Sequence, residues 1–365
     1  MKAKATEKSY IPEGKGAEEF HVLIKVTDAS LDFEEQLREV VSVYSEVTKG
    51  RTVHFRRIFL SDAANQAQDA ADALAAFGAV PTSFVQQPPL DGTKLAMWVY
   101  CTGPMDIHNG IPCHNGYSHH WDGSLTSPGE NPHAQMEGIF GLYDRKLQEG
   151  GLSVSENTVR TWIFCRDADV NYSGVVSGRK AYFDSIGLTS STHYIASTGI
   201  EGRHPLWKNT VEMDAYSVGG LDKGQIRYLK APDHLSPTID YGVTFERGSA
   251  ITYGDRRHIF ISGTASIDSK GKVVHPGNVS AQTSRMLENV SALLAEAGAT
   301  LGDIVMAIVY LRDASDYPKV RKVVSGACPG LEAVYVLAPV CRPAWLVEME
   351  CIGITWEGCS RWPEF

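Results

Sequence analysis

The chain has 365 residues, of which 43% are hydrophobic and 21% are charged. That length suits two or three domains of about 100–200 residues, with cores large enough to fold without disulfide or metal staples. The composition excludes collagen, coiled coils and wholesale disorder. The net charge of -9, with no stripe of Lys or Arg, argues against a nucleic-acid partner.

Targeting and redox signals point to one compartment. Residues 1–16 are charged and lack the apolar stretch of a secretory signal. No apolar run approaches the roughly 18 residues that a membrane span needs. The seven cysteines are scattered and form no Cys-x-x-Cys pair, so we interpret them as reduced thiols that mostly fill the core. We therefore expect a cytoplasmic protein with no membrane partner.

Internal repeats organise the chain. An apolar strand that ends in Asp-Ala before a helical stretch occurs three times, at residues 57–63, 162–168 and 308–314. Further echoes keep the same order: 99–103 with 260–264, 134–135 with 281–282, and 211–214 with 347–350. This regularity predicts three consecutive segments, which are a partial N-terminal unit over 1–92, a middle unit over 93–235 and a C-terminal unit over 236–365.

Secondary structure follows from the hydrophobic periods. A helix is expected over 65–77 in the N-terminal unit. The C-terminal unit predicts a hairpin of strands 259–265 and 272–274, helices over 286–297 and 317–327, and strands over 303–312, 333–337 and 346–355. The order β-β-α-β-α-β-β indicates an α+β fold with both helices on one face of a mixed sheet. The other face of each sheet must then meet something else.

The last strand carries acidic side chains. Alternation places Glu348 and Glu350 on one side of the strand, and Glu212 and Asp214 repeat this pattern in the middle unit. Unpaired carboxylates are costly to bury against packed helices. These residues should therefore line a cavity or an interface between units.

An insertion over 106–133 distinguishes the middle unit. It contains five of the 12 histidines, together with Cys113 and Asp122. Histidine and cysteine are zinc ligands, but their spacing fits no familiar finger or HExxH pattern. The four glycines of the segment equally suit a lid over a site or an oligomer contact. We predict no metal and no organic cofactor.

Several motifs resemble those of known families. Residues 260–264, Gln282, 297–299 and 347–350 resemble the YjgF/Rid superfamily over about 115 C-terminal residues. A narrower resemblance, over most of the chain, is to the chorismatases, which cleave the enolpyruvyl ether of chorismate. It rests on residues 261–267, 178–183 and 196–199, and on Cys341-Arg342 ahead of Glu348. Because Rid proteins are usually homotrimers, the resemblance implies either a monomer with a pseudo-trimeric core or a homo-oligomer, with the pocket between the middle and C-terminal units.

The chemistry implied by this resemblance needs an acid. Hydrolysis of an enol ether begins with proton delivery to the terminal methylene carbon, so the donor must be protonated near neutral pH. Glu348 suits this role, since an apolar cavity and the neighbouring Glu350 would both raise its pKa. Cys341 resembles the cysteine of the chorismatases that form an aromatic product, where it would assist proton transfer.

Substrate contacts are predicted from charge. Chorismate is a dicarboxylate, and arginine is the preferred partner for bidentate contact with a carboxylate. The candidate substrate-binding residues are Arg342, Arg247, Arg179, Thr264 and Ser266. The expected partner is thus a small carboxylate.

Other interpretations remain open at this stage. Glu348 would also suit a salt-bridged interface, and Cys341 a buried apolar position. A Rid-type enamine or imine deaminase would need an arginine before the penultimate strand, where residues 330–333 read Gly-Leu-Glu-Ala. A non-catalytic metabolite-binding protein would need no acid at all.

Overall fold

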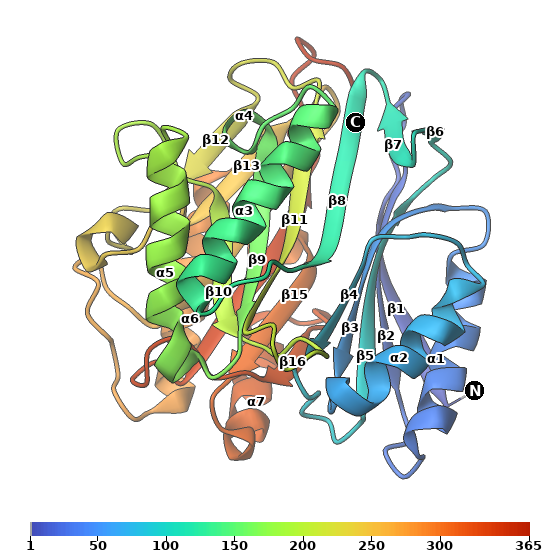
Figure 1. Ribbon diagram of the computed structural model, residues 1–365, viewed down its shortest axis with the longest axis vertical. Helices are drawn as coiled ribbons and strands as arrows, with labels where there is room; N and C mark the ends of the chain where they lie inside the picture. Colours follow the sequence, from blue (N-terminus) through green and yellow to red (C-terminus); the bar gives the residue numbers. More distant parts are fainter. Residues whose placement is uncertain (1) are drawn as a thin grey trace.

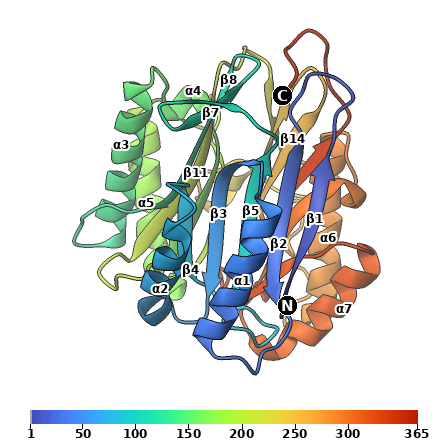
Figure 2. The same cartoon turned by 90° about the vertical axis from the view of Figure 1, so that its right-hand side faces the viewer.

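The structure is a computed structural model that describes residues 2–365. Three sheets face one another around a common axis, and the longer helices lie on their outer sides (Figure 1; Figure 2). Each sheet is formed by one consecutive part of the chain. The predicted α+β pseudo-trimer is confirmed. No helix in residues 2–365 is long and apolar enough to cross a bilayer.

The N-terminal unit has five strands in the order β1-β2-β5-β3-β4. Only β3 and β4 run parallel to each other. Its elements are β1 (Ala3–Tyr10), β2 (Glu19–Val26), α1 (Phe33–Val47), β3 (Thr52–Leu60), α2 (Ala63–Ala75), β4 (Thr82–Gln86) and β5 (Leu95–Thr102).

Strand β5 corrects the predicted unit boundary at residue 92. It pairs with both β2 and β3, so the N-terminal sheet continues to Thr102 and is complete rather than partial. The echo of 99–103 with 260–264 therefore does not mark the start of the middle unit. The sequence pattern misleads because β5 carries Ala96 and Trp98 where the last strands of the other units carry acids.

The middle unit has six strands in the order β10-β9-β11-β8-β7-β6, with β9 and β10 parallel. Its elements are β6 (Asp106–His108), β7 (Ile111–His114), β8 (Tyr117–Leu125), α3 (Pro132–Glu149), α4 (Val154–Asn157), β9 (Thr158–Cys165), α5 (Ala168–Ser185), β10 (Ala196–Glu201) and β11 (Val211–Gly219).

The C-terminal unit has six strands in the order β12-β13-β14-β17-β15-β16, with β15 and β16 parallel. Its elements are β12 (Ile226–Leu229), η1 (Thr238–Tyr241), β13 (Gly248–Thr252), β14 (Arg257–Ala265), α6 (Val279–Glu296), η2 (Leu301–Asp303), β15 (Ile304–Leu311), η3 (Ala314–Asp316), α7 (Tyr317–Ala327), β16 (Val334–Leu337) and β17 (Val347–Thr355). The predicted 272–274 strand is absent, and that segment forms only an isolated bridge between Ile267 and Val273.

Local signals explain the helix positions. The side chain of Asn278 caps α6 by accepting a hydrogen bond from the backbone N–H of Ala281. Buried Val290 and Leu293 lie on the inner face of α6, as the period predicted. Asp32 and Glu35 form a capping box at the start of α1.

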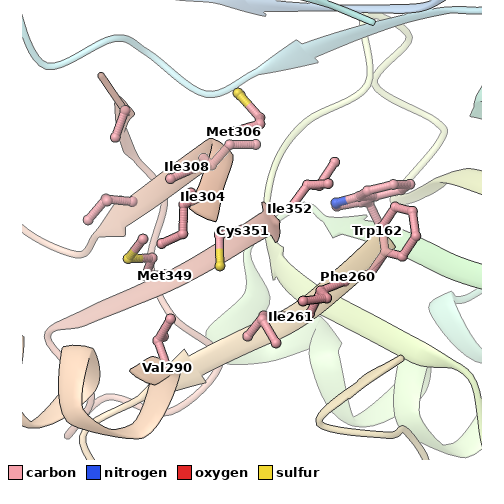
Figure 3. Packing of buried hydrophobic residues seen from close by; sticks show 14 of the residues in the cluster. Trp162, Phe260, Ile261, Val290, Ile304, Met306, Ile308, Met349, Cys351 and Ile352 are labelled. Carbon is pink, nitrogen blue, oxygen red and sulfur yellow. The ribbon is translucent and has the colours of Figure 1, made fainter. Parts of the chain in front are cut away.

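A large apolar core lies between the three sheets. It includes Trp98, Trp162 and Ile352, one from each sheet. Figure 3 shows Ile352 beside Trp162, with Met306 on the neighbouring strand. Burial of this shared core is what holds the three units together, since each sheet leaves its inner face without helices of its own.

The histidine-rich segment is structured rather than a loop. Its first part forms β6, β7 and β8, which extend the middle sheet. His119 lies in the core between the three sheets, where it forms a hydrogen bond of 2.9 Å with the Tyr216 hydroxyl. His108, in contrast, is exposed. Within residues 2–365 no three His, Cys, Asp or Glu side chains are grouped so that they could hold a metal ion.

Candidate active site between the middle and C-terminal units

A cavity of about 420 Å³ lies where the middle and C-terminal units meet. The middle unit contributes one face of α5 and residues 197–199 of β10. The C-terminal unit contributes β14, the segment before β13, and the segment that carries Cys341, Arg342 and Trp345 ahead of Glu348. This volume falls in the range of small-molecule sites.

Glu348 is the acid on the wall of this pocket. It is the second residue of β17 and is only 4% exposed. Burial, reinforced by the charge of Glu350, raises its pKa to about 8, although Arg247 and Arg160 oppose the shift. A carboxyl group in this state holds its proton at neutral pH and can donate it.

A glycine lets this carboxyl group lie close to the neighbouring strand. A Cβ atom added to Gly263 of β14 would come within 2.1 Å of Oε1 of Glu348. Real Cβ atoms do not approach oxygen that closely, so any larger residue would displace the carboxyl group. The absence of a side chain at Gly263 therefore leaves the space that the acid occupies.

Glu350 does not line the pocket and lies beside Trp98 and Trp162 of the core between the three sheets. Its Oε2 accepts a hydrogen bond from Nη2 of Arg160 at 2.7 Å, and its Oε1 lies 3.7 Å from Nη1 of Arg57. Arg57 in turn donates two hydrogen bonds to Asp214. Glu350 is thus an ion-paired neighbour of the acid.

Cys341 faces the same pocket as Glu348. Burial raises the pKa of its thiol to about 12, and nearby Glu348 acts in the same direction, so the thiol stays neutral. The Tyr172 hydroxyl hydrogen-bonds to this thiol. Tyr172 itself lies over Gly199, where a Cβ atom would meet the hydroxyl oxygen at 2.5 Å.

The three candidate arginines occupy different positions. Arg247 and Arg342 are on the pocket wall, next to Phe245 and Trp345 respectively. Arg179 is 1% exposed and lies behind the wall, where it donates hydrogen bonds to the hydroxyls of Thr244 and Ser197.

Thr264 and Ser266 are not on the pocket wall. Their hydroxyls donate to the backbone carbonyls of Ser262 and Val274. Gly263, Ala265 and Ile267 line the pocket instead. This placement gives no support to the prediction of Thr264 and Ser266 as substrate contacts.

Equivalent positions in the other units differ from this site. Glu348 is matched in register by Glu212 of β11 and by Ala96 of β5. Neither carboxylate oxygen of Glu212 has a hydrogen-bond partner among the described residues, and burial raises its pKa well above the usual value. The place of Gly199 is taken by Phe84 in β4 and by Tyr335 in β16. Aromatic side chains therefore occupy the positions at which the middle unit has a glycine.

Sequence reasoning placed the pocket between the middle and C-terminal units and cited residues 196–199, but it did not name Tyr172 or Thr198 as site residues. Tyr172 and Thr198 come from α5 and β10, far from Glu348 in the chain. Helical spacing from Ala168 and Asp169 would have placed Tyr172 on the same face of α5. Thr198 belongs to the 196–199 motif, but nothing in that motif assigns a role to its hydroxyl.

Comparison with known proteins places the chain in a family. The profile described as Endoribonuclease L-PSP matches residues 249–355. A RutC family protein of Pyrococcus abyssi is 38% identical over 97 residues, which are 26% of this chain and 76% of that protein. The chain belongs to the YjgF/Rid superfamily. The 3-aminoacrylate deaminase RutC of Acinetobacter baylyi is 37% identical over 65 residues, which are 18% of this Rid chain and 52% of that enzyme.

Most of the chain also matches a solved structure. The crystal structure of a chorismatase aligns with a TM-score of 0.62 and 19% sequence identity, over 83% of this chain and 93% of that one. The likeness extends well beyond the C-terminal unit, so the arrangement of all three units is that of the chorismatase fold.

Proposed function

We propose that this protein is a chorismatase-like enzyme that cleaves the enolpyruvyl ether of chorismate, or of a related carboxylated cyclic substrate, and releases pyruvate. The observation that carries the proposal is the buried Glu348 carboxyl, protonated near neutral pH, on the wall of a pocket that also holds Arg247 and Arg342. The likeness to the chorismatase fold supports it.

The proposed reaction assigns each group a step. Glu348 gives its proton to the terminal methylene carbon, which converts the enol ether into an oxocarbenium ion. The Glu348 carboxylate formed at that moment stabilises the cation. Water or a substrate hydroxyl adds to the cation and returns a proton to Glu348. With water, the resulting hemiketal collapses to an alcohol and pyruvate.

The remaining wall residues have supporting roles in this proposal. Arg247 and Arg342 bind the substrate carboxylates. Cys341 stays neutral and can pass a proton on the route to a hydroxybenzoate product. Arg179 acts indirectly, by holding the wall residue Ser197 and the buried Thr244 behind the wall.

The test couples chorismate turnover to lactate dehydrogenase and follows NADH oxidation by the released pyruvate. Wild type should release pyruvate and Glu348→Gln should not, whereas the exposed control Glu149→Gln should match wild type. Full turnover by Glu348→Gln would identify a different acid. No pyruvate from concentrated wild type would refute the proposal.

A second candidate is a Rid-type enamine or imine deaminase, favoured by the identity with the RutC deaminase. It would release ammonia from 3-aminoacrylate and would give no pyruvate from chorismate. Chorismate binding without either product would indicate a metabolite-binding protein.

A further inference from the structure

Thr198 occupies a special place beside the acid. It lies in β10 on the pocket wall and is almost fully buried. The Cβ position of Gly263 is 2.1 Å from Oε1 of Glu348 and 3.0 Å from Cγ2 of Thr198. The methyl group of Thr198 and the carboxyl group of Glu348 therefore both lie close to Gly263, although the two residues come from different units.

The hydrogen bonds of the Thr198 hydroxyl use its two lone pairs but not its proton. A threonine hydroxyl has two acceptor lone pairs and one donor proton. Nη2 of Arg160 donates to Oγ1 of Thr198 at 2.5 Å, and the backbone N–H of Gly263 donates to it at 2.9 Å. Both lone pairs are used, and the structure gives the proton no acceptor among the side chains that it describes. The hydroxyl can therefore act only as a donor.

Arg160 makes this donor stronger than an ordinary hydroxyl. Its guanidinium is buried and fixed between Thr198 and Glu350. Glu350 also faces Arg57, which pairs with Asp214, so the positive charge of Arg160 is held in an alternating chain of buried charges. A donor to the hydroxyl oxygen polarises its O–H bond, and this cooperative effect is larger in a low-dielectric interior.

We propose that Thr198 is a substrate-binding residue whose hydroxyl donates a hydrogen bond to a carboxylate oxygen of the ligand beside Glu348. This inference rests on the proposed function for the choice of an enolpyruvyl substrate. The ether oxygen is the poorer acceptor, since a hydrogen bond there would withdraw the electrons that stabilise the oxocarbenium ion. The carboxylate of the enolpyruvyl group carries a full charge and lies next to the carbon that becomes cationic.

The test measures chorismate binding by titration calorimetry in the Glu348→Gln background, where the proposed turnover is blocked. Thr198→Val removes the hydroxyl and keeps the shape, whereas Thr198→Ser keeps the hydroxyl. We expect Thr198→Val to weaken chorismate binding by roughly 10- to 100-fold, the usual range for a hydrogen bond to a charged group. The chorismate affinity of Thr198→Ser should stay within about threefold of that of the Glu348→Gln protein, which is the parent of both variants.

A second ligand separates binding from structural damage. 3-Hydroxybenzoate lacks the enolpyruvyl carboxylate, so its affinity should change little in Thr198→Val. Equal weakening of both ligands, unchanged chorismate affinity in Thr198→Val, or no chorismate binding to the parent would each overturn the assignment. If binding depends on Thr198 but the wild type releases no pyruvate, only the proposed function fails.

Discussion

Replacement of Glu348 by glutamine should stabilise the protein while it removes the proposed activity. The pKa of Glu348 is about 8 in the folded protein against an ordinary 4.5. Below pH 4.5 the group is protonated in both states and has no effect. Between pH 4.5 and 8 only the unfolded chain loses the proton, so stability falls as pH rises, by about 1.4 kcal/mol per pH unit. At pH 7 the penalty reaches about 3 kcal/mol, and glutamine removes it.

Urea unfolding at pH 5, 6 and 7, followed by tryptophan fluorescence, measures this effect. The quantity to compare is the difference in unfolding free energy between Glu348→Gln and wild type at each pH, because the other titrating groups cancel in it. The difference should grow steadily with pH. Glu149→Gln, an exposed replacement of the same kind, should show no such growth.

A constant difference across this pH range would refute the reasoning. It would mean that Glu348 ionises in the folded protein much as it does in water, and the acid of the proposed mechanism would be lost. If the difference in unfolding free energy grows with pH but Glu348→Gln still releases pyruvate, the pKa of Glu348 is raised as described but Glu348 is not the catalytic acid.

Three further predictions follow from other buried groups. Gly263→Ala should displace the carboxyl of Glu348 and lower pyruvate release by about 100-fold, as measured with the coupled assay, while circular dichroism shows an intact fold. Burial lowers the pKa of His21 to about 4 and of His54 to about 3, so only the unfolded chain takes up these protons below pH 6.5. His21→Gln or His54→Gln in the Glu348→Gln background should therefore remove about 2 kcal/mol of the stability loss between pH 6.5 and 5, and a difference from the Glu348→Gln protein that stays constant over this range would contradict this. Glu212→Gln should raise stability at pH 7 and leave pyruvate release unchanged, because the raised pKa of Glu212 has the same cause but the residue is outside the pocket.

The alternation of side chains along a strand correctly predicted the side on which Glu348 lies, but it did not predict which residues of the neighbouring strand β14 line the pocket. Residues 347–350 form one regular strand, so the side on which Glu348 points could be predicted. In β14 the pairing with β17 shifts between Ile261 and Thr264. An irregularity of this kind changes which residues face the pocket, and the sequence does not reveal it.

Long-range contacts explain what else was missed. The repeat predicted three units and their interfaces, because echoes in fixed order are visible in the sequence. The pairing of Thr198 with Arg160 and Gly263 depends on how two units dock, which no local period records. The end of the N-terminal unit was misplaced for a related reason. Strand β5 is the last strand of its sheet, but it lacks the acidic residues that mark the last strands β11 and β17 in the sequence.

Joining three units in one chain frees each of them to change alone. In a trimer of identical subunits, a substitution appears at every interface, and so does the destabilising effect of a protonated buried acid. Here Phe84 and Tyr335 occupy the places that correspond to Gly199, and Ala96 replaces one acid altogether. Two of the contacts between units can thus be purely structural, while the contact between the middle and C-terminal units keeps a pocket.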